Sequence, residues 1–291
     1  MVEILNAPTV EPSRARSKWS PKLVAGGLII AALVVIAVFA PWIAPRDPLE
    51  QDLMLGTLPP IGFAGSAPGY YLGTDDLGRD ILSRMIYGSR IALVVAVAAA
   101  AITAIVGTVL GLVAGYYGGW VDLIISRLVD VWMAFPPVLL SILLVAVIGP
   151  GVTSVVIAIA IIDWTRFCRV IRAETMAQAQ MDYVSAARSI GFSPLSILLR
   201  EILPNVAPVI IVLVSLEMGI AVIVEAILSF VGLSVSSDAP TWGGMIAQGR
   251  QIIHQGSWVL TFPLIVLFIT VLAFNQLGDG LRQATDPVMR R

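Results

Sequence analysis

Few side chains in this sequence are of the types that carry catalysis. The chain has one histidine, His254, and one cysteine, Cys168, and these lie far apart in the sequence. It also lacks the G-x-S-x-G motif that presents the nucleophile in serine hydrolases. A lone histidine with no nucleophile beside it has nothing to activate. We therefore expect no catalytic residue in this chain.

The positions of the lysines exclude hydrolysis of ATP by this chain. A phosphate-binding P-loop needs Gly-Lys followed by Ser or Thr, because the lysine must reach the phosphates. The only lysines are Lys18 and Lys22, both near the N-terminus and outside any such motif. If ATP drives this protein, a partner must bind and hydrolyse it.

Four carboxylates interrupt long apolar runs. Asp130 and Asp163 each have an arginine three residues away, so we expect local ion pairs. Glu217 and Glu225 have no basic residue within four positions and lie about 80° apart on one expected helix. An ionised group in hydrocarbon costs about 3 kcal/mol, so each must face water, a partner or the bundle interior. These two glutamates are our candidates for lining a pathway, and in an ion-driven secondary transporter they would bind a proton or cation.

The elements that position these residues are membrane spans. The chain is 58% hydrophobic and 13% charged, and its mean hydropathy is +0.91. Its long uncharged runs of apolar residues indicate an all-α, polytopic membrane protein with six transmembrane helices. The fourth run is the least regular, because Asp163 and Arg166 interrupt it. We expect the spans at 23–44, 91–117, 128–148, 152–170, 206–231 and 257–277.

Charge distribution sets the orientation. A basic tail, residues 1–22, precedes a six-helix transmembrane domain that spans residues 23–291. If the N-terminal tail is cytoplasmic, six crossings place most of the 18 basic residues on the cytoplasmic side. Membrane proteins carry an excess of Lys and Arg on that side. Both termini and a loop at 171–204 are then cytoplasmic, and loops at 45–90 and 232–256 are extracytoplasmic. Because His254 and Cys168 fall on opposite sides, they cannot share a metal ion, and we expect no metal site.

Three further patterns concern the second and third spans and the first outer loop. Prolines 136 and 137 should kink the third span. In the first outer loop, residues 74–76 are expected to cap a short helix that includes Ile81. The second span carries a glycine every fourth residue, which would form a smooth stripe for close approach of another helix. These glycines are Gly107, Gly111, Gly115 and Gly119.

The loop at 183–204 has the pattern of a helical hairpin. Its first half shows the i, i+3, i+4, i+7 spacing of an amphipathic helix, at Tyr183, Ala186, Ala187 and Ile190. Gly191 stands where a helix ends, Ser193 and Pro194 start a second helix, and Pro204 is expected to end it. Such a hairpin could dock into a soluble partner, or it could rest on the lipid surface through its arginines.

The same loop resembles a known motif. Ser185-Ala186-Ala187, then Gly191, then Leu203-Pro204 have the spacing of the EAA loop of ABC-importer permeases. Two positions depart from that pattern, because Ser185 replaces the usual Glu and Glu201 the usual Ile. Further stretches resemble the dipeptide/oligopeptide/nickel permeases, and their order is most similar to the C-type subunit of the oligopeptide permease. These stretches are residues 72–90, 111–119, 224–233, 240–246 and 273–287.

This resemblance implies a type I ABC-importer permease fold in the inner membrane, with no enzymatic activity and no cofactor of its own. Its implied partners are a second, homologous permease, two ATPase domains that bind ATP and Mg, an extracytoplasmic peptide-binding protein and membrane lipid, but not nucleic acid. Oligopeptides are the expected substrate, and dipeptides, nickel chelates and haem are alternatives. The resemblance assigns coupling to the ATPase to Tyr183, Ser185, Ala186, Ala187, Gly191, Leu203 and Pro204.

Overall fold

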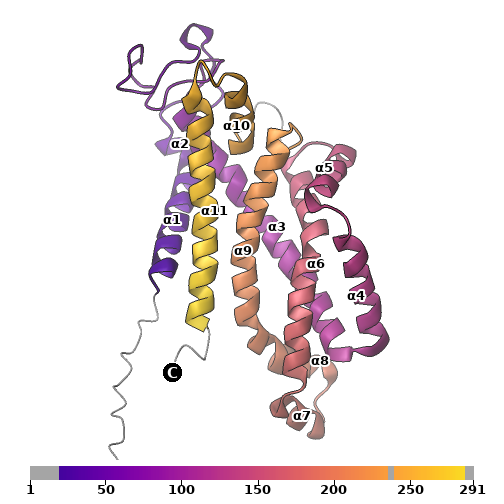
Figure 1. Ribbon diagram of the computed structural model, residues 1–291. Helices are drawn as coiled ribbons and strands as arrows, with labels where there is room; N and C mark the ends of the chain where they lie inside the picture. The colour runs from indigo at the N-terminus through magenta and orange to yellow at the C-terminus, as the bar shows by residue number, and fades with distance from the viewer. Residues whose placement is uncertain (1–19, 235–238, 286–291) are drawn as a thin grey trace, which may run out of the picture.

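The computed structural model describes residues 20–234 and 239–285, and within them the chain forms helices and no strand. Figure 1 shows the long helices running side by side as a bundle. The all-α prediction is confirmed. Of the predicted tail, only residues 20–22 fall within the described part. The five long helices are α1 (Pro21–Val38), α3 (Ile81–Tyr117), α6 (Val152–Ala179), α9 (Leu203–Phe230) and α11 (Ser257–Thr285).

Four of the described helices are long and apolar enough to cross a membrane alone: α1, α3, the continuous helix from Pro194 to Phe230, and α11. A fifth span is formed if the bent pair α4 (Gly119–Met133) and α5 (Pro137–Ile148) is counted as one. α6 corresponds to the fourth predicted span, 152–170, and continues to Ala179. Its 28 residues give it a length of about 42 Å, enough to cross a membrane. It is nevertheless more charged than the four helices named above, because Asp163, Arg166 and Arg169 lie within it.

The third predicted span is two helices rather than one kinked helix. α4 begins at Gly119, well before the predicted start at 128, and α5 lies at 86° to it. Pro136 is extended, with ψ of 119°, and Pro137 opens α5. Two successive prolines remove two backbone donors and hold the preceding residues out of the helical region, so the chain turns here.

The second span begins earlier than predicted, and the first outer loop is correspondingly shorter. α3 starts at Ile81, where Asp80 caps it by accepting a hydrogen bond from the N–H of Ser83 at 2.8 Å. The expected cap at 74–76 is wrong, because those side chains bind elsewhere. Asp75 forms a buried ion pair with Arg79 at 2.7 Å, and the residues of α3 that were expected to lie in the loop pack beneath α10.

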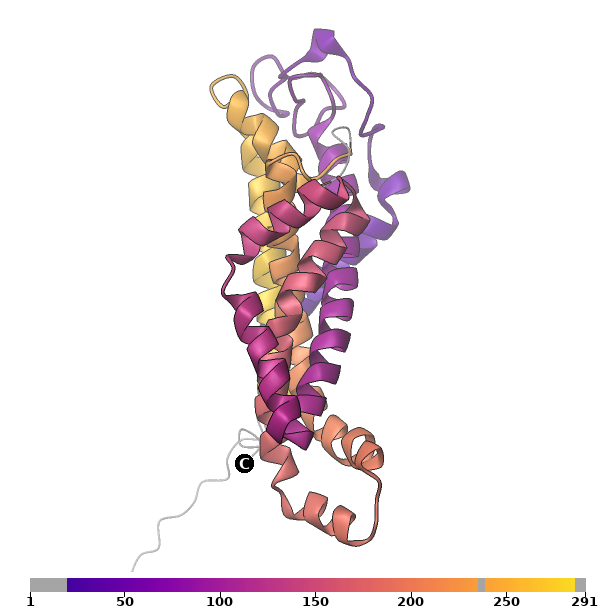
Figure 2. The ribbon, with the colours of Figure 1, turned by 90° about the vertical axis from the view of Figure 1, so that its right-hand side faces the viewer.

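α10 (Trp242–Gln251) occupies the second predicted outer loop. Its Trp242 is buried and donates a hydrogen bond from Nε1 to the carbonyl of Met85 at 3.0 Å. Figures 1 and 2 show α10 and residues 44–80 at one end of the bundle, and α7 (Asp182–Ser189) at the other. α1 begins and α11 ends at the α7 end, where Lys22 pairs with Asp279 at 3.2 Å.

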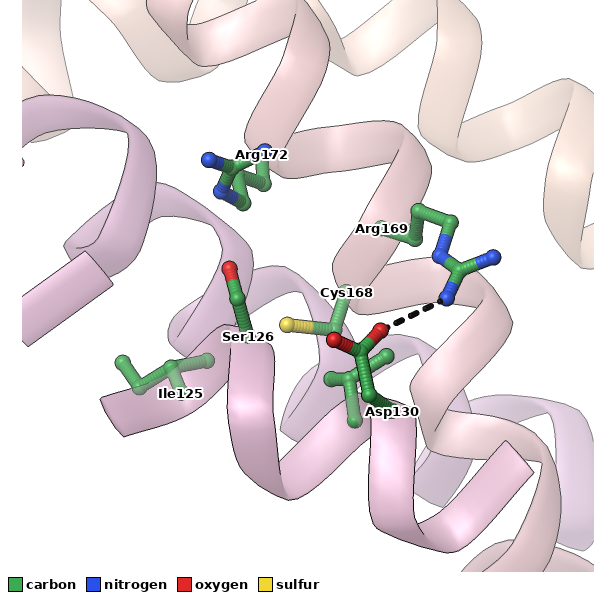
Figure 3. A pocket seen from close by; sticks show the side chains of 7 residues that line it. Ile125, Ser126, Asp130, Cys168, Arg169 and Arg172 are labelled. Atoms are coloured by element: carbon green, nitrogen blue, oxygen red, sulfur yellow. Dashed lines mark hydrogen bonds and ion pairs between the residues drawn. The ribbon is translucent and has the colours of Figure 1, made fainter. Parts of the chain in front are cut away.

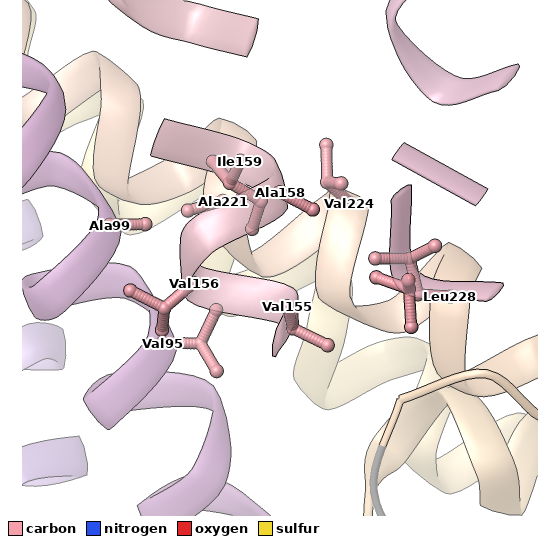
Figure 4. Close-up of a cluster of buried hydrophobic side chains, with 10 residues drawn as sticks. Val95, Ala99, Val155, Val156, Ala158, Ile159, Ala221, Val224 and Leu228 are labelled. Carbon is pink, nitrogen blue, oxygen red and sulfur yellow. The ribbon is translucent and has the colours of Figure 1, made fainter. Parts of the chain in front are cut away.

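Small side chains fill the centre of the bundle. Figure 4 shows the meeting of α3, α6 and α9, where alanine and β-branched residues let the helices approach closely. This cluster holds together the three helices that carry the charged groups and the hairpin described next. Its labelled members are Val95, Ala99, Val155, Val156, Ala158, Ile159, Ala221, Val224 and Leu228.

Candidate functional site

The loop after α6 folds as the predicted helical hairpin up to its tip. α7 ends in a Schellman motif, in which the N–H of Phe192 donates to the carbonyl of Ala187 and the N–H of Gly191 to that of Arg188, both at 3.1 Å. Gly191 has φ of +90°, which a residue with a Cβ adopts only with strain. This geometry reverses the chain within a few residues.

The second half of the hairpin differs from the prediction. Ser193 caps α8 (Pro194–Ile197) by accepting from the N–H of Ser196 at 3.3 Å, as expected. Pro204 does not end this helix, because a π-helical turn, η2 (Leu198–Ile202), connects it directly to α9. In the wider turn the N–H of Leu203 donates to the carbonyl of Leu198, five residues back. Pro204, which has no N–H, then falls in the first turn of α9, where a donor is not needed.

The inner side of the hairpin, residues 182–202, is fastened to three long helices. Val184 and Ala187 are buried against a cluster that includes Leu112 of α3, Ile171 of α6 and Val206 of α9. This packing means that displacement of the hairpin must be transmitted to the ends of all three helices.

Two polar contacts add to that attachment. The hydroxyl of Tyr183 donates to Oε1 of Gln178 at 2.7 Å and accepts from Nδ2 of Asn205 at 3.4 Å. Burial raises the pKa of Tyr183, so the hydroxyl remains a donor well above neutral pH. The guanidinium of Arg188 lies 5.0 Å from the ring centroid of Tyr116, near the end of α3.

The predicted coupling residues therefore divide into two groups. Ala187 is buried, and Tyr183 and Leu203 are half-buried, so these three attach the hairpin to the bundle. The outward-facing group is exposed and consists of Ser185, Ala186, Gly191 and Pro204. Figure 2 shows that the hairpin extends beyond the ends of the long helices. The large apolar side chains exposed on the hairpin were not among the predicted coupling residues, although Ile190 was expected on the apolar face of its first helix. These side chains are Ile190, Phe192, Leu195 and Leu199.

Three of the four predicted stripe glycines face α6. A Cβ on Gly111 would lie 2.9 Å from the carbonyl oxygen of Cys168, and one on Gly115 would lie 2.6 Å from that of Arg172. Gly107 lies as closely against Phe167. Only glycine permits this separation of the two helices. Gly119 does not belong to the stripe: it begins α4 with φ of +53° and has no atom near its Cβ position.

A cavity of about 330 Å³ lies between α4 and α6. Figure 3 shows its wall, where Arg169 pairs with Asp130 at 3.2 Å. Asp130 also lies 3.7 Å from Arg127, the local partner expected from the sequence. Closer to the C-terminal end of α6, Arg172 binds the carboxylate of Asp122 through two nitrogens. These ion pairs hold α4 against α6 where the chain leaves the glycine-lined interface.

The two glutamates proposed to line a pathway have different surroundings. Glu225 accepts hydrogen bonds from the hydroxyls of Ser229 at 2.6 Å and Ser234 at 3.0 Å, so it fixes the C-terminal end of α9. Glu217 lies 3.5 Å from Arg166 of α6, which also pairs with Asp163 at 3.3 Å. The pairing of Asp163 with Arg166 was expected. That of Glu217 was missed, because its partner lies 51 residues away on another helix.

The fold is shared with a solved ABC transporter. The chain superposes with a TM-score of 0.58 on a structure of the MetNI methionine ABC transporter in an inward-facing conformation, at 18% identity. The match covers 71% of this chain and 98% of that one. It shows that the bundle has the type I permease arrangement expected from the sequence.

Curated relatives cover almost the whole chain. The glutathione transport system permease protein GsiD of Shigella dysenteriae serotype 1 (strain Sd197) is 41% identical over 99% of this chain and 96% of its own length. The protein of the same name from Escherichia coli O157:H7 has the same identity and coverage.

Two family models also match the chain. Residues 20–60 match the N-terminal TM domain of oligopeptide transport permease C. Residues 107–291 match the binding-protein-dependent transport system inner membrane component. The likeness spans both the hairpin and the glycine-lined interface. The chain therefore belongs to the family of inner-membrane components of binding-protein-dependent transport systems, and it is a permease subunit of an ATP-driven importer, with the ATPase on a separate partner.

Proposed function

We propose that this chain is one of two homologous permease subunits that together enclose the translocation path of a peptide importer, and that the 182–202 hairpin docks into an ATPase partner. The observation that carries the docking is the set of large apolar side chains exposed on the hairpin, beyond the end of the bundle. In water such a patch favours burial against another protein. Its attachment to α3, α6 and α9 would turn movement of the ATPase into movement of the spans.

The proposed orientation follows from this docking. The hairpin end of the bundle faces the cytoplasm, where ATP and Mg are bound by two ATPase domains. Both termini then lie on the cytoplasmic side, because α1 begins and α11 ends at that end. The opposite end, with residues 44–80 and α10, faces the extracytoplasmic peptide-binding protein.

A peptide substrate is supported by the relatives and by the family models. The 41% identical proteins are named for glutathione, a small peptide, and residues 20–60 match a domain of an oligopeptide permease. The similarity extends along nearly the whole chain, so it includes every span that could line a path. Dipeptides and short oligopeptides are therefore the proposed cargo, ahead of nickel chelates and haem.

The docking is tested by the same substitution at the two ends of the molecule. Leu195 on the hairpin and Leu53 in the outer loop are both strongly exposed, so an aspartate at either position leaves the bundle intact. Leu195→Asp should abolish co-purification of the ATPase, while Leu53→Asp should retain it. Retention of the ATPase by Leu195→Asp at the wild-type level would show that the hairpin is not its docking site.

A further inference from the structure

Three charged groups lie at the middle of the membrane-spanning region. Arg166 and Glu217 are both close to the midpoints of their helices, α6 and α9, which have 28 residues each. At 1.5 Å per residue each lies about 20 Å from either helix end. Asp163, one turn from Arg166, completes the cluster. The cluster therefore falls near the centre of the bilayer, where charge is most unfavourable.

The three groups differ in exposure. The side chain of Glu217 is 1% exposed and that of Asp163 is 7%, whereas 43% of the Arg166 side chain is open. A guanidinium open to hydrocarbon at this depth would be strongly destabilising. This face of α6 and α9 is therefore turned away from lipid, and in the proposed pair of permease subunits it would line the translocation path between them.

The accessible charge along this path is positive. Three residues further along α6, Arg169 is 54% exposed, and across from it on α4 Arg127 is 75% exposed. The acid between them, Asp130, is 52% exposed. Three arginines but only one carboxylate are open, because Asp163 and Glu217 are covered. The charged groups of this strip that a ligand in the path can contact are therefore mostly guanidinium groups, which bind carboxylates.

Arg166 is also held in a way that leaves donors available. Its terminal nitrogens contact Asp163 at 3.3 Å and Glu217 at 3.5 Å. Each terminal nitrogen carries two hydrogens and Nε carries one, so donors remain for another acceptor. A planar guanidinium matches the two oxygens of a carboxylate, and a fixed guanidinium loses less freedom when it binds.

We propose that Arg166 binds the carboxylate of the transported peptide as it passes the middle of the membrane, with Asp163 and Glu217 holding the guanidinium in position. This rests on the proposed function, since a peptide supplies the carboxylate. Arg166 is thus a substrate-binding residue, and the two buried acids are positioning residues.

Uptake by two variants distinguishes a role of Arg166 in binding substrate from a role in neutralising the two acids. The probe is glutathione, supplied with the complete complex and its binding protein in proteoliposomes. Arg166→Gln should lower uptake at least about tenfold. The triple variant D163N/R166Q/E217Q leaves no unpaired charge, and its uptake should stay equally low. Recovery of uptake in the triple variant would overturn the proposal, because it would show that Arg166 serves only to neutralise the acids.

The ATPase readout keeps this proposal apart from the docking of the hairpin. In both variants, hydrolysis of ATP stimulated by the loaded binding protein should match wild type, because the hairpin is unchanged. If wild-type complex fails to take up glutathione at all, the proposed cargo is wrong. If wild type takes up glutathione and Arg166→Gln does so equally well, the binding role of Arg166 is wrong and the proposed function stands.

Labelling in the assembled complex tests whether the position faces water. Cys168 is the only cysteine, so C168A removes the background. In C168A/R166C, a membrane-impermeant methanethiosulfonate should modify the new thiol. F268C/C168A is the lipid-facing control, since Phe268 is an exposed apolar residue of α11. Labelling of Arg166→Cys no faster than the control would contradict the proposal.

Discussion

Replacing Gly107 by alanine should destabilise the contact between α3 and α6. The added Cβ would lie 2.7 Å from the carbonyl oxygen of Trp164 and 3.0 Å from the backbone nitrogen of Cys168, besides its contact with Phe167. Carbon atoms pack at about 3.5 Å or more, so the helices must separate by roughly 1 Å at this level. Overpacking of this kind costs about 1–3 kcal/mol. The higher helix propensity of alanine offsets about 1 kcal/mol of that.

A matched control isolates the overpacking. Gly27 of α1 has no atom within 4 Å of its Cβ position, so Gly27→Ala gains only the helix propensity. The stability difference between Gly107→Ala and Gly27→Ala should therefore be about 1–3 kcal/mol. The assay is the thermal midpoint of the purified subunit in detergent, followed by the loss of monodisperse protein. Equal midpoints for the two variants would refute the role of the glycine stripe.

Three further predictions concern the hairpin, and each is measured as glutathione uptake per ATP hydrolysed in the reconstituted complex. Gly191→Ala should lower the ratio, because Gly191 has a positive φ. Gly191→Asn should lower it less, since asparagine tolerates positive φ better than alanine. Equal ratios for the two variants would argue against a conformational need for glycine. Tyr183→Phe, which loses the hydroxyl contacts to Gln178 and Asn205, should lower the ratio without affecting membrane insertion, and an unchanged ratio would remove Tyr183 from the attachment. Replacing Tyr116 by leucine should lower the ratio through loss of the guanidinium contact, whereas phenylalanine, which keeps the ring, should preserve it; a loss with phenylalanine as large as with leucine would contradict that reason.

Local patterns in the sequence were sufficient for much of the fold. The spacing of Gly107, Gly111 and Gly115 gives one helix face whatever the partner helix is, and the structure shows α6 on that face. Gly191 and Ser193 mark the hairpin tip because a helix end and a helix start each depend on a few adjacent residues. Signals of this kind need no knowledge of tertiary contacts.

What was missed depends on contacts between distant segments. The short helix expected around Ile81 was not expected to be continuous with the second span, and its burial against α10 has no local signal in the sequence. Pro204 fails to stop its helix because the preceding π-helical turn accommodates it. The ion pair of Glu217 with Arg166 joins residues on separate helices, so their sequence positions carry no sign of it.

Uptake into proteoliposomes tests the central claim most directly. The complete complex of this chain, its partner permease, the ATPases and the binding protein should accumulate glutathione only when ATP is supplied on the hairpin side. This chain alone, under a proton or sodium gradient, should accumulate none, because the bundle requires the ATPases to drive its movement. Uptake by the chain alone under an ion gradient, with no ATPase present, would contradict the account.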